Sequence, residues 1–291
     1  MIPAPILEGE PMKEFRVKDH YDMDDYRALI RFLRGPDGCP WDRVQTHQSI
    51  RRNLLEEAYE AAQAIDSDDA ENQREELGDL LMQVLLHADM EAERGTFDLD
   101  DVADTSCKKL VFRHPHVFGS AAADDPEAVL ATWEEQKRAE KGQRSVTEAM
   151  EAVAKALPAL WRAEKVQKKA ADVGFEWPDS SYAMTKLREE TDELAAGIEA
   201  GDRDNVAEEV GDVLFSAVNL ARMLGVDPEA ALHAACGKYI RRFGFVETEA
   251  EKQGKNLGEL TVFDMESLYQ EARSRLEGKE KQFYLDKSSN E

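Results

Sequence analysis

The stretch LLEEAYEAAQAIDSDDAENQREELGDLLMQV, residues 54–84, decides the fold. Its apolar residues recur every three or four positions on both sides of a short polar segment. This period predicts two amphipathic helices, over 49–66 and 71–94. Ser67, with the aspartate pair after it, provides a stop for the first helix, and Gly95 provides a C-terminal signal for the second.

The rest of the chain follows the same plan. Only 17 Gly and 10 Pro occur in 291 residues, and long stretches are rich in Ala, Leu, Glu, Lys and Arg. The composition and period predict an all-α protein, and the length predicts two domains. Further helices are expected over 99–114, 147–172, 181–200, 203–224, 228–252 and 260–277. The expected organisation is an extension over 1–22, an N-terminal domain over 23–118, a connection over 119–146, a C-terminal domain over 147–277 and a tail over 278–291.

The acidic pattern of the first stretch occurs again in LREETDELAAGI, residues 187–198, and AEEVGDVLFSAV, residues 207–218. In each half EExxE precedes EExGD, and the last Glu of the first block lies 16 positions before the second Glu of the next. Carboxylates three positions apart share one side of a helix, and this gap lets the chain turn back antiparallel. The carboxylates expected to face one another are Glu57, Glu60, Glu76 and Asp79 in the first half, and Glu190, Glu193, Glu209 and Asp212 in the second.

Four carboxylates that converge between helices repel one another unless a cation binds among them. Oxygen ligands without imidazole or thiolate favour Mg²⁺, with Mn²⁺ as the usual substitute. A di-iron bundle does not fit, because its Glu-x-x-His pattern occurs at none of the six histidines. A chain with 61 acidic residues also produces such strings on solvated helix faces. Two copies with the same gap nevertheless favour a metal site in at least one half.

Each half also has a basic pair downstream of its acidic blocks. Lys238 and Arg242 are four positions apart, as are Lys109 and Arg113. Both members of such a pair share one helix face, which suits two contacts to a polyphosphate chain.

The overall charge limits the partners. The chain has 61 acidic and 37 basic side chains, a formal charge of −24, and no run of five or more Lys or Arg. This argues against nucleic acid as a partner. No apolar run approaches the roughly 18 residues that span a bilayer, and the start lacks a secretory pattern. We therefore expect a soluble, cytoplasmic protein without a membrane partner.

Several shorter motifs accompany the acidic blocks: GCPWD at 38–42, QTH at 45–47, RHPHVF at 113–118, ALPAL at 156–160, VGFEW at 173–177 and GDVLFSAVNLAR at 211–222. With these motifs the chain resembles the MazG family of nucleoside triphosphate pyrophosphohydrolases in its two-domain form. The resemblance covers nearly the whole chain, from about residue 26 to 275. It implies tandem MazG-like helical bundles of the all-α NTP pyrophosphohydrolase superfamily, which assemble as a homodimer.

The resemblance also implies a reaction. NTPs and dNTPs would be hydrolysed with Mg²⁺ between the α and β phosphates to a nucleoside monophosphate and pyrophosphate, with broad base specificity and a housekeeping role in the nucleotide pool. The family's metal ligands fall on the eight carboxylates named above, and its phosphate-binding pair falls on Lys238 and Arg242. Where the second half has Arg241 before Arg242, the first half has a phenylalanine, so we expect the C-terminal domain to be the principal catalyst.

Other roles are expected from the chemistry of the site. Glu189, or one of Glu190, Glu193, Glu209 and Asp212, would accept the proton of the attacking water. Trp177 precedes the first carboxylate helix of the second half and could stack on a base, although structural aromatics are commoner there.

Two other interpretations stay open. The first is a narrower, dUTPase- or dCTPase-like pyrophosphohydrolase, which would cleave a single pyrimidine nucleotide. The second is a helical regulatory protein that binds nucleotides without hydrolysing them. It is disfavoured because all eight carboxylates are present.

Overall fold

The computed structural model describes residues 15–119, 125, 129, 133, 136, 140 and 145–288, with side chains up to residue 275. Within these residues the chain is helical and forms no strand, so the predicted all-α class is confirmed. The chain divides into two compact units, Met1–Glu140 and Lys141–Glu291. None of the described helices is long and apolar enough to cross a membrane.

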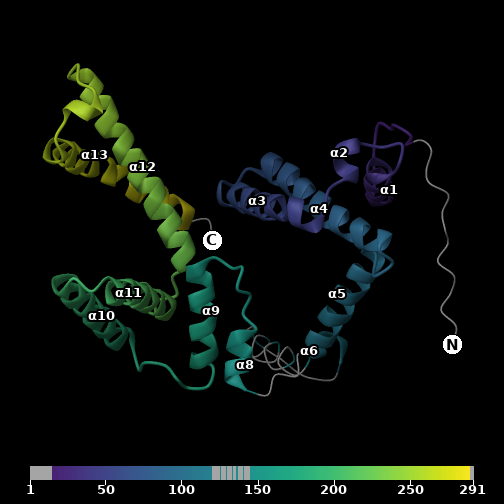
Figure 1. Ribbon diagram of the computed structural model, residues 1–291, viewed down its shortest axis with the longest axis horizontal. Helices are drawn as coiled ribbons and strands as arrows, with labels where there is room; N and C mark the ends of the chain where they lie inside the picture. The colour runs from purple at the N-terminus through teal and green to yellow at the C-terminus, as the bar shows by residue number, and fades with distance from the viewer. Residues whose placement is uncertain are drawn as a thin grey trace. The chain divides into compact units, whose positions relative to one another are not determined.

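The first unit is built around an antiparallel pair of helices, α3 and α4, with α1 packed against α4 (Figure 1). Helix α5 follows α4 and leads away from the pair. The described helices of this unit are α1 (Met23–Arg34), α2 (Pro40–Arg43), α3 (His47–Asp66), α4 (Ala70–Glu93), α5 (Leu99–Arg113) and α6 (Pro115–Phe118).

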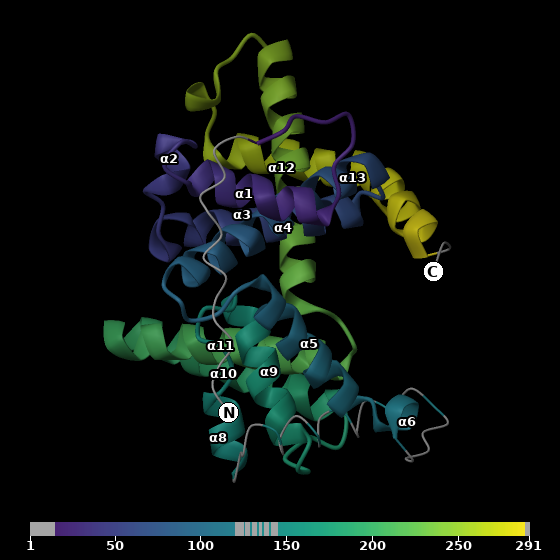
Figure 2. The same cartoon turned by 90° about the vertical axis from the view of Figure 1, so that its right-hand side faces the viewer.

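The second unit contains a similar pair, α10 and α11, which lie side by side in both views (Figure 1, Figure 2). Helix α9 packs on α11, and the long helices α12 and α13 pack on each other. The described helices are α8 (Val146–Glu151), α9 (Ala159–Ala171), α10 (Ser180–Ala200), α11 (Arg203–Met223), α12 (Pro228–Lys252), the 3-10 turn η1 (Leu257–Glu259) and α13 (Val262–Ser288).

The prediction of a single helix over 147–172 is wrong. The chain forms α8 and α9 instead, with a break between them that ends at Pro158. Proline disfavours a helical conformation at the residue before it and has no N–H for the helix ladder, so a helix restarts only after Pro158. The C-terminal helix also differs from expectation, because α13 continues to Ser288 rather than ending near residue 277.

The two hairpins turn in the same way. The turn residues Asp68 and Gly201 occupy equivalent places, and both have a positive φ, +55° and +70°. The N–H groups of Asp69 and Asp202 donate to the carbonyl five residues earlier, at 3.2 and 3.3 Å. The carboxylates of Asp69 and Asp202 then cap the returning helix by accepting the N–H three residues further on. One turn geometry thus fixes the constant spacing of the acidic blocks.

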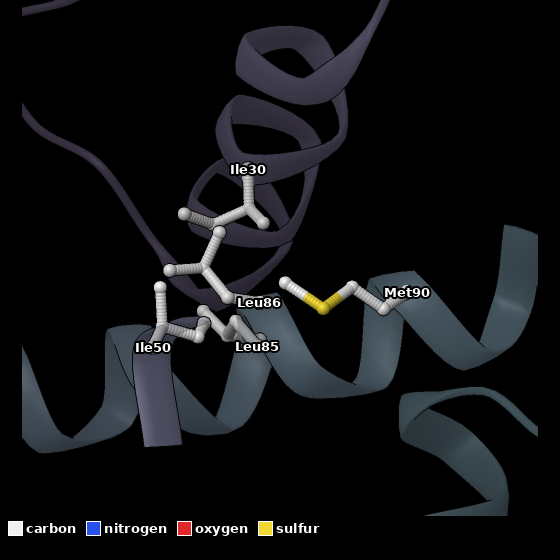
Figure 3. Close-up of a cluster of buried hydrophobic side chains, with 5 residues drawn as sticks. All are labelled: Ile30, Ile50, Leu85, Leu86 and Met90. Carbon is white, nitrogen blue, oxygen red and sulfur yellow. The ribbon is translucent and has the colours of Figure 1, made fainter. Parts of the chain in front are cut away.

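The core of the first unit lies where three of its helices meet (Figure 3). The buried side chains come from α1 (Ile30), α3 (Ile50) and α4 (Leu85, Leu86 and Met90), and each is at most 5% exposed. Burial of such side chains contributes about 1.5–3 kcal/mol each. This cluster holds α3 against α4 and so fixes the hairpin that carries the acidic blocks.

A histidine pair joins the same two helices. The rings of His47 and His87 are parallel to within 4°, with centroids 5.0 Å apart and Nδ1 atoms 2.7 Å apart. The rings are therefore coplanar and share an N–H···N hydrogen bond. The other nitrogen of His47 hydrogen-bonds Glu91 Oε1 at 2.7 Å. Nε2 of His87 is buried and has no partner among the described residues.

This pair predicts acid sensitivity. Burial, together with the neighbouring His47 ring, lowers the pKa of His87 below its ordinary value of 6.5. Because His87 takes up a proton more readily in the unfolded chain than in the folded one, its contribution to the free energy of unfolding is complete above about pH 6.5. This contribution is lost as the pH falls below that value. We expect urea unfolding between pH 7.5 and 5.5 to show this loss in the unaltered chain and a weaker one in His87→Gln. The exposed His20 provides a control, since an equal change in His20→Gln would contradict the assignment.

Candidate metal and phosphate site

Three carboxylates converge between α10 and α11. Ligand oxygens of Glu190, Glu193 and Glu209 all lie within 4.8 Å of one another. Glu190 is only 7% exposed. The charge of Glu190 is the main cause of a raised pKa at Glu193, and that of Glu209 also contributes. Carboxylates held this closely in a partly buried place favour a bound cation.

The two oxygens of Glu209 differ in their surroundings. Asn205 donates from Nδ2 to Oε1 at 3.0 Å, whereas Oε2 is buried and has no hydrogen-bond partner among the described residues. A buried carboxylate oxygen left without a partner is costly unless it binds a ligand. The geometry therefore fits a hard divalent cation, with Asn205 fixing the orientation of Glu209.

Gly197 allows Asn205 to take this position. A Cβ at Gly197 would lie 2.5 Å from Oδ1 of Asn205. A side chain there would displace the amide of Asn205 that holds Glu209.

Lys186 lies one turn before the carboxylates on α10. Its Nζ is 2.8 Å from Glu190 Oε1 and 3.5 Å from Glu189 Oε2. The hydrogen bond with Glu190 is the main cause of a raised pKa at Lys186. The equivalent place in the first half is the neutral Asn53, so at this position the second half has a cation where the first half has an amide.

The remaining acidic residues predicted in the second half lie at its edge. Asp212 is exposed and does not belong to the group of three. Glu189 is exposed beside Lys186. Their predicted roles as ligand and proton acceptor stay predictions.

A second carboxylate group lies between α3 and α4. Ligand oxygens of Glu57, Glu76 and Asp79 lie within 4.8 Å of one another, and all three residues are partly buried. Glu60 is exposed, but after burial its charge is among the causes that raise the pKa of both Glu57 and Glu76. All four residues predicted for the first half are thus close together.

We expect the chain to become more stable when one charge is removed from the carboxylate group between α3 and α4. Burial, followed by the charges of neighbouring carboxylates, raises the pKa of Glu57 and Glu76. A raised carboxyl pKa means that the ionised form opposes folding once the pH exceeds that pKa. We expect Glu57→Gln to raise the melting temperature of the metal-free chain at pH 7 by about 1–3 °C. Mg²⁺ should then stabilise the unaltered chain more than the variant, and equal stabilisation would contradict a metal site at Glu57.

The structure places the cations of the second half on α12. Lys238 is partly buried, Arg242 is 8% exposed and Arg241 is exposed. Among the described residues, neither Lys238 nor Arg242 forms an ion pair with Glu190, Glu193 or Glu209. Figure 1 shows α12 leading away from the α10–α11 hairpin.

The cations of the first half lie on α5. Lys109 is partly buried. Arg113 is 8% exposed, and it donates to Glu140 Oε2 from Nε at 2.9 Å and from Nη2 at 2.6 Å. Arg113 thus has a carboxylate partner within its own unit.

Trp177 stacks on Tyr182 at the start of α10. The ring centroids are 6.2 Å apart, the planes differ by 7°, and Trp177 is 43% exposed. A stacked ring with an exposed part suits base stacking, which stays a prediction for this residue.

Comparison with known proteins supports one family for both halves. The model of the MazG nucleotide pyrophosphohydrolase domain matches residues 45–118 and again residues 179–244. The nucleoside triphosphate pyrophosphohydrolase/pyrophosphatase MazG of Thermotoga maritima is 42% identical over 246 residues, which cover 84% of this chain and 93% of that protein. The chain belongs to the MazG family. The nucleoside triphosphate pyrophosphohydrolase of Escherichia coli K12 is 40% identical over 254 residues, which cover 86% of this chain and 97% of that protein.

The two family matches coincide with the structural repeat. They contain the hairpins α3–α4 and α10–α11 and the basic pairs that follow them on α5 and α12. Sequence reasoning missed Lys186 and Asn205, which contact the carboxylates of the second MazG repeat. A signal for Asn205 exists, because Asn72 precedes Glu76 by the same four positions.

Proposed function

We propose that this MazG-family chain is a nucleoside triphosphate pyrophosphohydrolase, which cleaves NTPs and dNTPs between the α and β phosphates. The observation that carries the proposal is the carboxylate group of Glu190, Glu193 and Glu209. Its Glu209 Oε2 is buried and has no hydrogen-bond partner among the described residues. The names of the Thermotoga maritima and Escherichia coli relatives describe this activity and support it.

Mg²⁺ is the proposed ion, with Mn²⁺ as a substitute. The donor set consists of carboxylate oxygens, which suit a hard divalent cation. Glu190, Glu193 and Glu209 would hold the ion, and Asp212 would join from the next turn. When bound, such an ion neutralises phosphate charge and makes a water more acidic.

The side chains around the proposed metal ligands would have separate roles in the reaction. Glu189 lies next to the group without belonging to it, which suits a base that takes the proton of the attacking water. Lys186 forms an ion pair with Glu190. When a metal ion binds Glu190 in its place, the Lys186 ammonium would bind a phosphate oxygen of the substrate instead. Lys238 and Arg242 would bind the β and γ phosphates and stabilise the departing pyrophosphate.

A homodimer would bring these groups together. Among the described residues, the cations on α12 form no ion pair with Glu190, Glu193 or Glu209 of the same chain, and α12 leads away from the α10–α11 hairpin. We therefore propose that α12 of one subunit completes the site of its partner. Large apolar side chains stay exposed on the helices concerned, which favours burial against a second copy. They include Ile198, Leu214, Leu232 and Ile240, each more than half exposed.

Broad base specificity and a housekeeping role in the cytoplasmic nucleotide pool complete the proposal. A panel of kcat/KM values for the common NTPs and dNTPs with Mg²⁺ tests it. Values within about tenfold of one another would agree with broad cleavage. Cleavage of one pyrimidine nucleotide alone would favour the dUTPase- or dCTPase-like alternative. Nucleotide binding without pyrophosphate release would favour the regulatory alternative.

A further inference from the structure

Trp177 and Tyr182 form an exposed aromatic pair at the start of α10. Their rings are parallel to within 7°, with centroids 6.2 Å apart. Trp177 is 43% exposed and Tyr182 is 52% exposed. Rings that stack on each other but stay half exposed leave aromatic surface for a further ring. This pair, which we call the aromatic platform, is therefore suited to bind a planar ligand.

The loop that carries Trp177 is anchored to α11. Nη2 of Arg222 lies 2.5 Å from Glu176 Oε2, and the Arg222 side chain is 14% exposed. The other oxygen of Glu176 accepts the N–H of Trp177 at 3.1 Å. Asp179 caps α10 by accepting the N–H of Ser181 at 2.8 Å. The aromatic platform is thus fixed before a ligand binds, which lowers the entropic cost of binding.

The aromatic platform lies in line with the proposed metal site along α10. Tyr182, Lys186 and Glu190 follow one another at intervals of four residues, so they share one face of the helix. Nζ of Lys186 lies 2.8 Å from Glu190 Oε1, as this spacing requires. At a rise of about 1.5 Å per residue, Tyr182 lies roughly 12 Å from Glu190 along the helix axis. A nucleotide whose phosphates bind at Glu190 and Lys186 would therefore extend its ribose and base toward Tyr182.

The first half has a serine where the second half has Tyr182. Ser49 precedes Glu57 by eight positions, as Tyr182 precedes Glu190. The hydroxyl of Ser49 donates to Gln45 Oε1 at 2.7 Å, within the turn before α3. The aromatic platform thus occurs in the half that also has Lys186 at its carboxylate group, which is the half expected to be the principal catalyst.

We propose that the nucleobase of the substrate stacks on the aromatic platform, and that Tyr182 determines how strongly the base binds. The inference rests on the proposed function, since it takes the carboxylate group between α10 and α11 as the triphosphate site. It deepens that function by assigning the base-binding end of the site and the direction of the nucleotide along α10.

Stacking would produce the broad base specificity proposed above. The two acids next to the rings have other partners, Glu176 with Arg222 and Asp179 with the first turn of α10. These carboxylates are therefore not placed to read the hydrogen-bonding edge of one base. An aromatic surface accepts every base, because each base has a π face.

The test compares Tyr182→Ala, which removes the ring, with Tyr182→Phe, which keeps it. In the full-length chain with Mg²⁺, Tyr182→Ala should raise KM for ATP about tenfold and leave kcat within about twofold, because the base lies far from the reacting phosphates. Binding of the α,β-methylene analogue of ATP, measured by calorimetry, should weaken by a similar factor. Binding of inorganic tripolyphosphate, which has no base, should stay within about twofold. Tyr182→Phe should resemble the unaltered chain in all three measurements.

Tyr21→Ala is the matched control. Tyr21 is also a half-exposed, stacked tyrosine, with its ring centroid 6.0 Å from that of Phe15 in the first unit. An equal loss in Tyr21→Ala would overturn the inference. So would an equal weakening of tripolyphosphate binding in Tyr182→Ala, no loss in Tyr182→Ala, or a tenfold loss in Tyr182→Phe. A lack of pyrophosphate release from the unaltered chain would instead refute the proposed function, while the two binding measurements would still decide on Tyr182.

Discussion

Glu190→Gln, introduced into a chain that already carries Glu57→Gln, should lower Mg²⁺-dependent pyrophosphate release at least about 100-fold. Glu190 is the most buried member of the second carboxylate group and lies within 4.8 Å of both other members. Glutamine has nearly the same shape but removes the negative charge that would hold the metal. The Glu57→Gln background excludes a contribution from the first group.

Stability separates this effect from a loss of fold. The fold should persist, because the change removes the repulsion with Glu193 while the amide oxygen of glutamine can still accept a hydrogen bond from Lys186. The melting temperature without metal should therefore stay close to that of the background chain. Glu199→Gln, an exposed change on the same helix, should leave turnover unaffected. Substantial Mg²⁺-dependent release by the Glu57→Gln, Glu190→Gln chain would refute the assignment of the second group as the catalytic centre.

A mixture of two inactive variants should recover activity if each site contains two subunits. Glu190→Gln removes a metal ligand from α10, and Lys238→Ala removes a phosphate cation from α12. In a mixed dimer, one site would combine both defects, whereas the other would combine intact carboxylates with intact cations. Random reassociation should therefore restore about a quarter of the activity of the unaltered chain.

The mixing experiment has a built-in control. Two Glu190→Gln samples, mixed in the same way, should stay inactive because every site lacks its ligand. Size-exclusion chromatography before and after mixing would show whether subunits have exchanged. Subunit exchange without recovered activity would contradict a site shared between subunits.

The sequence predicted the carboxylate hairpins closely. The helices expected over 181–200 and 203–224 are α10 and α11, with ends shifted by at most one residue. Long, regular apolar periods determine such helices, and aspartate caps mark where they begin. The prediction of one helix over 147–172 was wrong, because Pro158 interrupts the helix even though the apolar period continues on both sides of it.

The contacts around the carboxylates were less predictable. The repeat suggested the same four ligands in both halves, yet the first group joins Asp79 to Glu57 and Glu76, whereas the second joins Glu193 to Glu190 and Glu209. Sequence spacing fixes which side of a helix a carboxylate occupies, but not which rotamer it adopts. Contacts such as the ring of Tyr269 over Arg242 depend on how two helices pack, which their separate periods do not specify.

The central claim is that the chain hydrolyses triphosphates with a metal held by the second carboxylate group. Pyrophosphate and monophosphate release from the common NTPs and dNTPs, with Mg²⁺ or with EDTA, tests it most directly on the unaltered chain, Glu57→Gln and Glu190→Gln. We predict equimolar pyrophosphate and monophosphate that require Mg²⁺, persist in Glu57→Gln and disappear in Glu190→Gln. Release of orthophosphate instead of pyrophosphate, or no release from any nucleotide with Mg²⁺, would contradict the claim.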